Sequence, residues 1–391
     1  MKRVDRKRLE ALRRLKDVHD ALLEDLSIVT GVLDQKTLKF TPKVSIWDLA
    51  FWGKSVLRTF LSQIEALSYT LRKLVVDFAD ELGVELSDEK RSELREPQLG
   101  LVESLQLSFR SFPVLFGTEY QLDLSGDGWQ ALATLVDIRN ELTHPETVEQ
   151  LMGREIYRSL APAQAWFFAR FEELLSLCAG VIPGAAPPFG FPSIPSHGYE
   201  KQIELFEKDD DSSLRPASLQ SLEYARVAFS ILLDDTSRGI SGSTTLSKID
   251  TLLGRNGQLG LKCWVRAFAS EVECTVAVVK LVIASSKDVS LSAEDRLSLE
   301  GDFEADEQLA RVLNLWSREF GAQKQIKAGG ANAQALLNVL KIPHRLAHPK
   351  SPKDLRVSLK EVELMGNADN WFRDVTNAAG LRIENVAKTS E

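Results

Sequence analysis

One stretch of the sequence occurs twice, and this repetition restricts the folds open to the chain more than any other feature. Residues 130–145 read QALATLVDIRNELTHP and residues 334–349 read QALLNVLKIPHRLAHP, with seven of sixteen positions identical. Shorter matches flank this stretch at nearly the same offset, namely Leu86–Ser87 with Leu291–Ser292 and Trp166–Phe167 with Trp371–Phe372. Because the spacing is kept across so long a distance, the pattern indicates a duplicated unit of about 170 residues.

Within each copy, the hydrophobic residues follow the spacing of helices. Leu57, Phe60, Leu61 and Ile64 begin a run in steps of three and four, which is typical of an amphipathic helix. The matching segment 272–283 is rich in β-branched residues and would suit a strand by itself. Its match to the first copy predicts a helix that is buried nearly all round. Further helices are predicted over 4–33, 88–112, 129–143, 148–180, 218–236, 303–320, 331–342 and 353–380.

The predicted fold is therefore all-α, with two tandem antiparallel bundles of four or five helices each. A run of prolines and glycines over 182–198 separates the copies, and an acidic stretch follows it. A helix cannot continue through such a run, so it is read as an extended linker. The expected domains are 1–182, a linker over 183–216, and 217–391. We expect the two bundles to pack as a pseudo-twofold pair, as in a dimer of identical subunits.

Composition narrows the class of protein. Among 391 residues, 44% are hydrophobic and 27% are charged, which is ordinary for a globular protein. There is no apolar run long enough for a transmembrane helix, and the basic start MKRVDRKRLEALRRLK has no apolar core of a secretory signal. The three cysteines, which lack CxxC spacing and are odd in number, favour a reducing cytoplasm.

Charge is distributed unevenly along the chain. The net charge is −8, yet residues 1–16 carry eight basic side chains against Asp5 and Glu10. The overall charge makes binding to nucleic acid through bulk electrostatics improbable. The basic start is read either as the solvated face of a first helix or as a local patch that attracts phosphate, and the solvated face is the preferred interpretation.

The most informative residues stand at the end of the first repeated helix, in the order Arg139–Asn140–Glu141–Leu142–Thr143–His144–Pro145. This order resembles the Arg–Asn–x–x–x–His signature of the HEPN superfamily, whose members are helical bundles and often metal-independent endoribonucleases. The resemblance implies two HEPN-like bundles and a site composed of one motif from each of two facing domains. It implies no cofactor and no metal.

By this resemblance, His144 would act as general base or acid, because an imidazole exchanges protons near neutral pH. Arg139 would hold and stabilise the phosphate, since a guanidinium presents a charged planar fork to phosphate oxygens. Asn140 would orient the pair or bind the phosphate. RNA supplies its own nucleophile, the 2′-hydroxyl, so the products would be a 2′,3′-cyclic phosphate and a 5′-hydroxyl.

The second copy departs from this signature. Pro343 stands where the first copy has Arg139, and His344 stands where it has Asn140, while His348 is retained. Two arrangements would still give a composite site. Arg139 and His144 could work with His348 and Arg345, with His344 as a possible supporting residue, or two chains could join their first halves as a homodimer. The competing interpretation is structural, because basic residues and a following proline are common at helix C-termini.

Glu65 and Glu273 are a repeated acid, matched at an offset of 208 together with Phe60 and Ser62. Glu65 lies off the main apolar stripe of its helix and is expected either to reach and orient the Arg139 motif or to form a surface ion pair. His344 and His348 have the i,i+4 spacing of metal ligands on a helix. The flanking prolines are expected to leave little helix there, so no metal site is predicted.

Three functions remain open at this point. The first is a metal-independent endoribonuclease, by analogy in a prokaryotic defence, toxin or stress system. The second is a non-catalytic HEPN-like module that binds RNA or a protein partner such as an antitoxin. The third is a purely structural helical scaffold. The nuclease hypothesis predicts that Arg139 and His144 face a shared cleft between the bundles, whereas the scaffold hypothesis predicts that they cap their own helix.

Overall fold

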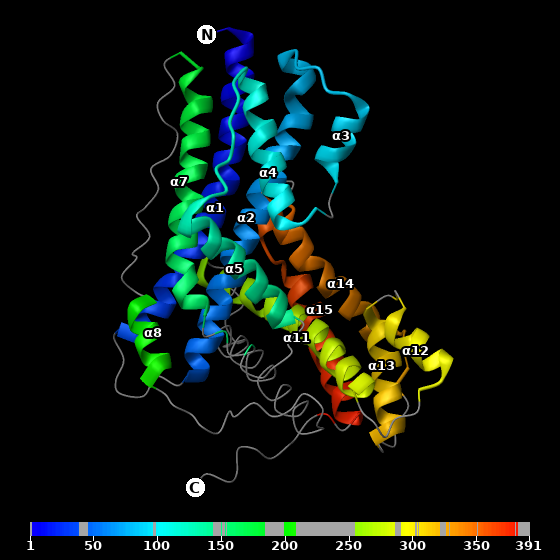
Figure 1. Cartoon of the computed structure of the whole chain (residues 1–391). Coiled ribbons are helices and arrows are strands. Elements are labelled where there is room, and N and C mark those ends of the chain that lie inside the picture. The colour runs from blue at the N-terminus through cyan, green and yellow to red at the C-terminus, as the bar shows by residue number, and fades with distance from the viewer. Residues whose placement is uncertain are drawn as a thin grey trace.

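The computed structural model describes residues 2–38, 46–96, 99–143, 150, 153, 155–183, 199–208, 255–285, 291–301, 303, 305–320, 326–327, 329–349, 351–379 and 381. Every regular element in these ranges is a helix, which confirms the all-α prediction (Figure 1). No helix within them has the length and apolar character needed to span a bilayer. The predicted helix over 218–236 lies outside the described residues.

Two long helices, α1 (Arg3–Leu38) and α2 (Ile46–Leu82), pack along each other and form the spine of the first half (Figure 1). The short α3 (Asp88–Arg95) and α4 (Leu101–Ser111) return along α2, and the 3-10 turn η1 (Phe112–Phe116) follows directly. The half is closed by α5 (Gly126–Thr143), which packs on α7 (Ile156–Gly180). Leu57, Phe60, Leu61 and Ile64 are fully buried in α2, as their spacing predicts.

The second half is also entirely helical in its described residues. It contains α11 (Arg255–Ser285), α12 (Ala293–Glu300), α13 (Ala305–Phe320), α14 (Ala331–Ala347), the 3-10 turn η3 (Pro352–Leu355) and α15 (Leu359–Ala378). The β-branched segment 272–283 is helical and mostly buried, as predicted. Even a cap is shared: Ser87 Oγ accepts from the backbone N–H of Lys90, and Ser292 Oγ accepts from that of Asp295, at positions with the same offset.

Three predicted helices differ from the structure at proline or serine. The segment 88–112 is split into α3 and α4, because Glu96 precedes a proline and takes an extended ψ of 116°. The segment 353–380 is divided at Ser358, which starts α15 with a capping box to Glu361. The prediction that helix ends near 342 is wrong: α14 runs through Pro343 to Ala347, since Leu346 in its last turn is fully buried and anchors it.

The segment between the copies is also different from the expected linker over 183–216. It contains the helix α8 (Tyr199–Lys208), which packs on α7. Tyr199 and Gln202 are buried, and the Tyr199 ring lies 6.0 Å from that of Tyr157. This helix is difficult to predict from sequence because it follows a run of prolines and its amphipathic pattern covers only ten residues. The rest of the proline run and the acidic stretch lie outside the described residues.

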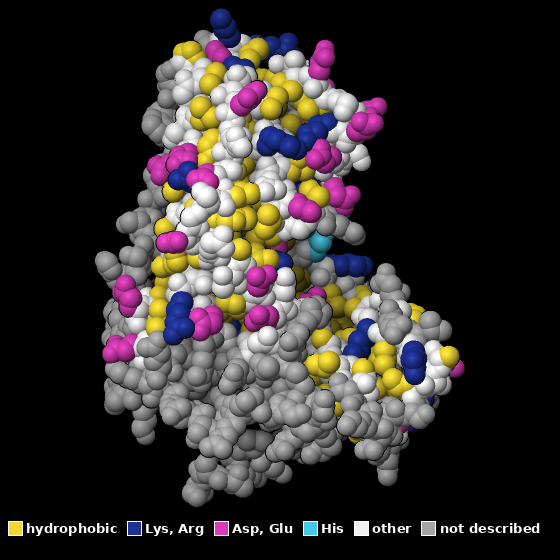
Figure 2. Space-filling model, in the orientation of Figure 1, with side chains coloured by type: hydrophobic (Ala, Val, Ile, Leu, Met, Phe, Trp, Pro, Cys, Tyr) yellow, Lys and Arg dark blue, Asp and Glu magenta, His cyan; other side chains and the backbone are white. Residues whose placement is uncertain are grey.

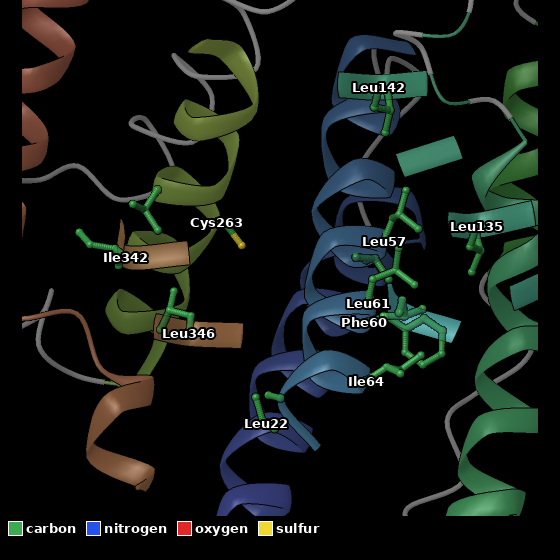
Figure 3. Packing of buried hydrophobic residues seen from close by; sticks show 14 of the residues in the cluster. Leu22, Leu57, Phe60, Leu61, Ile64, Leu135, Leu142, Cys263, Ile342 and Leu346 are labelled. Atoms are coloured by element: carbon green, nitrogen blue, oxygen red, sulfur yellow. The ribbon is translucent and has the colours of Figure 1, made fainter. Parts of the chain in front are cut away.

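The two halves contact each other reciprocally. Helix α2 of the first half packs on α14 of the second, and α5 of the first half packs on α11 of the second. By the sequence match, α2 corresponds to α11 and α5 corresponds to α14, so the two contacts join corresponding pairs of helices. The buried side chains of both halves belong to one continuous hydrophobic cluster. Figure 3 shows part of it, with Leu57 and Leu61 on α2, Leu135 and Leu142 on α5, Cys263 on α11, and Ile342 and Leu346 on α14.

Candidate functional site

A cleft of about 430 Å³ lies where α2, α4 and α5 of the first half meet α11 and α14 of the second. In the space-filling view, the molecule is hollowed between its upper part and the lobe of α12 and α13, with a histidine at the edge (Figure 2). The cleft brings together most of the residues singled out in the sequence, from both copies: Glu65, Arg139, Asn140, Glu273, His344 and His348.

Arg139 is held in the cleft by an ion pair between helices. Its Nη1 donates to Glu65 Oε1 at 2.5 Å, and its Nη2 lies 3.4 Å from the side-chain oxygen of Asn140. Both members of the pair are partly open to solvent, at 32% for Arg139 and 26% for Glu65. Glu65 on α2 therefore orients the guanidinium of Arg139 on α5.

His144 lies outside the described residues, one position beyond the end of α5. The structure therefore gives no geometry for the predicted general base or acid. Thr143, its neighbour, lines the cleft and donates from its hydroxyl to the Arg139 carbonyl at 3.1 Å.

The second copy contributes two histidines one turn apart, His344 in the last turn of α14 and His348 at the C-cap of that helix. The centroids of the His344 and His348 rings lie 4.5 Å apart, and those of the His348 and Tyr69 rings lie 5.1 Å apart in a T-shaped arrangement. His344 is exposed and His348 is half-buried. Burial, with smaller contributions from His344 and Arg72, lowers the pKa of His348 to about 4. His348 is therefore a neutral imidazole at pH 7, able to accept a proton but not to donate one as an imidazolium.

This shift predicts a pH dependence of stability. The folded pKa of His348 is about 4 and its ordinary value is about 6.5, so the unfolded chain binds more protons between these limits. Stability should therefore fall as the pH drops from 6.5 towards 4. In urea unfolding measured between pH 7.5 and 4.5, His348→Asn should lose less stability than the wild type. Equal losses in the two proteins would contradict the shift, while His19, whose pKa burial also lowers, acts equally in both.

Arg345 does not line the cleft. Its guanidinium donates to the backbone carbonyls of Asp354 and Arg356 and pairs with Glu361 at 2.7 Å. These bonds tie α14 to η3 and to the start of α15. The geometry thus gives Arg345 a structural task, and it does not support the expectation that Arg345 completes a second-half motif.

Sequence reasoning missed two arginines that line the cleft, Arg58 on α2 and Arg266 on α11. They stand at the same offset of 208 as Glu65 and Glu273, so extending that match towards the N-terminus would have found them. Arg266 is 94% buried. With Arg139, the cleft holds three arginines against two glutamates, so it carries a positive balance in a chain whose net charge is −8.

Three of the eight basic side chains near the start of the chain form ion pairs with acidic side chains. Lys7 pairs with Glu10 and Glu81, Arg14 pairs with Glu10 at 2.6 Å, and Lys16 pairs with Asp20. None of residues 2–16 lines the cleft. This arrangement fits the solvated helix face better than a separate phosphate-binding patch.

The three cysteines are buried in helices, as their apolar context predicts. Burial raises the pKa of Cys178 to about 12 and that of Cys263 to about 11, so neither offers a thiolate at neutral pH. In the described part of the chain, no three His, Cys, Asp or Glu side chains gather as a metal site would need. Comparison of this chain with protein-family models, with curated proteins and with solved structures finds no match.

Proposed function

We propose that the protein is a metal-independent endoribonuclease of HEPN type, with one composite site between two related halves of a single chain. The observation that carries this proposal is the cleft itself. It places Arg139 and Asn140 of the intact motif together with His344 and His348 of the degenerate one. If these residues only capped their own helices, nothing would require them to line the same cavity together with three arginines.

The lining of the cleft supports the duplication on which the proposal rests. Fourteen of its eighteen residues form pairs at the repeat offsets of 208 and 204. Three of these pairs are identical: Arg58 with Arg266, Ser62 with Ser270, and Glu65 with Glu273. Such pairing is expected on the axis of a pseudo-twofold pair. It favours an intrachain site over the alternative in which two chains join their first halves.

The side chains of the cleft suit cleavage of an RNA phosphodiester by the neighbouring 2′-oxygen. In the proposed reaction, the 2′-oxygen of RNA attacks the adjacent phosphorus, its proton passes to a neutral imidazole, and the bond to the 5′-oxygen breaks as that oxygen takes a proton. His348 is neutral at pH 7 and is proposed as the proton acceptor. His144 is proposed as the donor. Arg139 would stabilise the charge that develops on the phosphate oxygens.

One observation favours a second candidate function. In it, the protein is a non-catalytic module that binds RNA or a protein partner such as an antitoxin. Proline stands at position 343, where a second catalytic arginine would be expected. A module that has lost cleavage would still show salt-sensitive RNA binding, because phosphate contacts release counterions.

The test is cleavage of a mixed structured RNA by the purified protein in EDTA, with the 3′ ends analysed. We expect cleavage and 2′,3′-cyclic phosphate ends, both lost in His144→Ala. Cleavage that persists in His144→Ala would place the activity elsewhere. Salt-sensitive binding without cleavage at any protein concentration would support the binding module and refute the nuclease.

A further inference from the structure

Arg266 is a buried cation without a counter-charge in the described part of the chain. Its side chain is 6% exposed and lines the cleft from α11. Its Nη1 lies 3.5 Å from Thr59 Oγ1, at the outer limit of a hydrogen bond. Its Nε has no hydrogen-bond partner among the described residues, and none of their carboxylates forms an ion pair with it.

The neighbouring cation on the same helix is treated differently. Lys262, one turn before Arg266, is also buried, and its Nζ pairs with Asp25 of α1 at 2.5 Å. The fold therefore supplies a carboxylate for one buried cation of α11 and none, in the described residues, for the other. An arginine in a protein stays charged, and a buried charge without a partner is strongly unfavourable. An anion that enters the cleft would supply what Arg266 lacks.

We propose that Arg266 binds a phosphate group of RNA in the cleft and provides, for the second half, the guanidinium that Pro343 cannot provide. The identity of the ligand as RNA rests on the proposed function. The chemistry fits, because the planar fork of arginine matches two phosphate oxygens. The place fits as well, since Arg266 lines the same cleft as Arg139 but comes from the opposite half. Arg345, the nearer replacement in sequence, is bound elsewhere.

The experiment measures binding of a 2′-O-methyl oligoribonucleotide, which cannot be cleaved, at several salt concentrations. In Arg266→Met, we expect affinity to fall about tenfold, and the slope of log affinity against log salt to fall by about one, since one phosphate contact is lost. Arg266→Lys keeps the charge and should keep the slope while losing part of the affinity. Arg158→Gln, a matched control whose residue does not line the cleft, should bind as the wild type does.

Thermal unfolding separates ligand binding from a structural role. Arg266→Met fills similar space without a charge, so it should melt at the same or a higher temperature than the wild type. Thr59→Val removes the weak hydrogen bond but keeps the guanidinium, so it should bind the oligonucleotide normally. A lower melting temperature of Arg266→Met with unchanged oligonucleotide affinity would overturn the proposal and make Arg266 a structural residue.

The two proposals fail in different ways. If cleavable RNA stays intact while oligonucleotide binding depends on Arg266, the nuclease is refuted and the phosphate site is upheld. If the wild type cleaves RNA and Arg266→Met binds and cleaves equally well, the nuclease is upheld and the role of Arg266 is refuted. A wild type that does not bind the oligonucleotide at low salt refutes the role of Arg266 directly.

Discussion

Replacing Arg139 by alanine is expected to lower the rate of RNA cleavage about 100- to 1,000-fold, the effect of removing one preorganised donor from a developing anion. The side chain is already oriented in the cleft by its 2.5 Å contact with Glu65, so little of its binding energy is needed to position it. The loss should appear in kcat more than in KM, because the charge on the phosphate grows in the transition state. Single-turnover cleavage of a short labelled RNA measures it.

Glu65→Gln is the matched variant for this experiment. It keeps a hydrogen-bond acceptor for Arg139 but removes the charge, so Arg139 is held less firmly and remains able to bind phosphate. We expect a loss of about tenfold, well short of that in Arg139→Ala. Arg158→Gln, outside the cleft, serves as the control. If Arg139→Ala cleaves as fast as the wild type, the ion pair with Glu65 is structural and the nuclease site is not here.

Replacing Asp25 by alanine is expected to lower the unfolding free energy by about 3–5 kcal/mol, because it leaves the buried ammonium of Lys262 without a counter-charge. The Asp25–Lys262 pair joins α1 of the first half to α11 of the second, with side chains 9% and 6% exposed. Burial lowers the pKa of Lys262 and Asp25 opposes this shift. Without Asp25 the lysine loses its proton more easily, so the deficit of the variant should shrink as pH rises. Urea unfolding at several pH values measures both effects.

The control is the double variant Asp25→Leu with Lys262→Met, which removes both charges and keeps the volume. It should recover most of the stability, because replacing a buried pair by apolar side chains is often neutral or stabilising. A double variant as unstable as Asp25→Ala would show that packing at this contact, and not the stranded charge, determines the loss.

The sequence predicts the helices well where hydrophobic spacing is long and regular. The run through Leu57, Phe60 and Ile64 and the β-branched run after Val272 are both buried helices. The sequence predicts helix ends poorly where a helix-breaking residue stands among residues that favour a helix. Pro343 predicts the end of a helix, but the buried Leu346 keeps α14 helical beyond it. Tertiary burial outweighs the local cost of proline there, and periodicity cannot show this.

The candidate site divides in a similar way. The Arg–Asn pair, the repeated glutamates and the two histidines of the second copy could be named from sequence, because they stand in matched or signature positions. That Glu65 contacts Arg139 could be expected only as an alternative, since helix phase gives a face and not a partner. The role proposed for Arg266 could not be read from sequence, because the absence of a counter-charge among the described residues depends on which helices surround α11.

The reciprocal contacts of α2 with α14 and of α5 with α11 have a consequence for how the protein works in a cell. Both walls of the cleft belong to one molecule, so they meet at a high effective concentration however few copies are made. Dilution therefore does not separate the two walls of the cleft. If the proposed nuclease site is correct, each half needs to supply only part of the catalytic groups, and Pro343 in place of an arginine is consistent with that division.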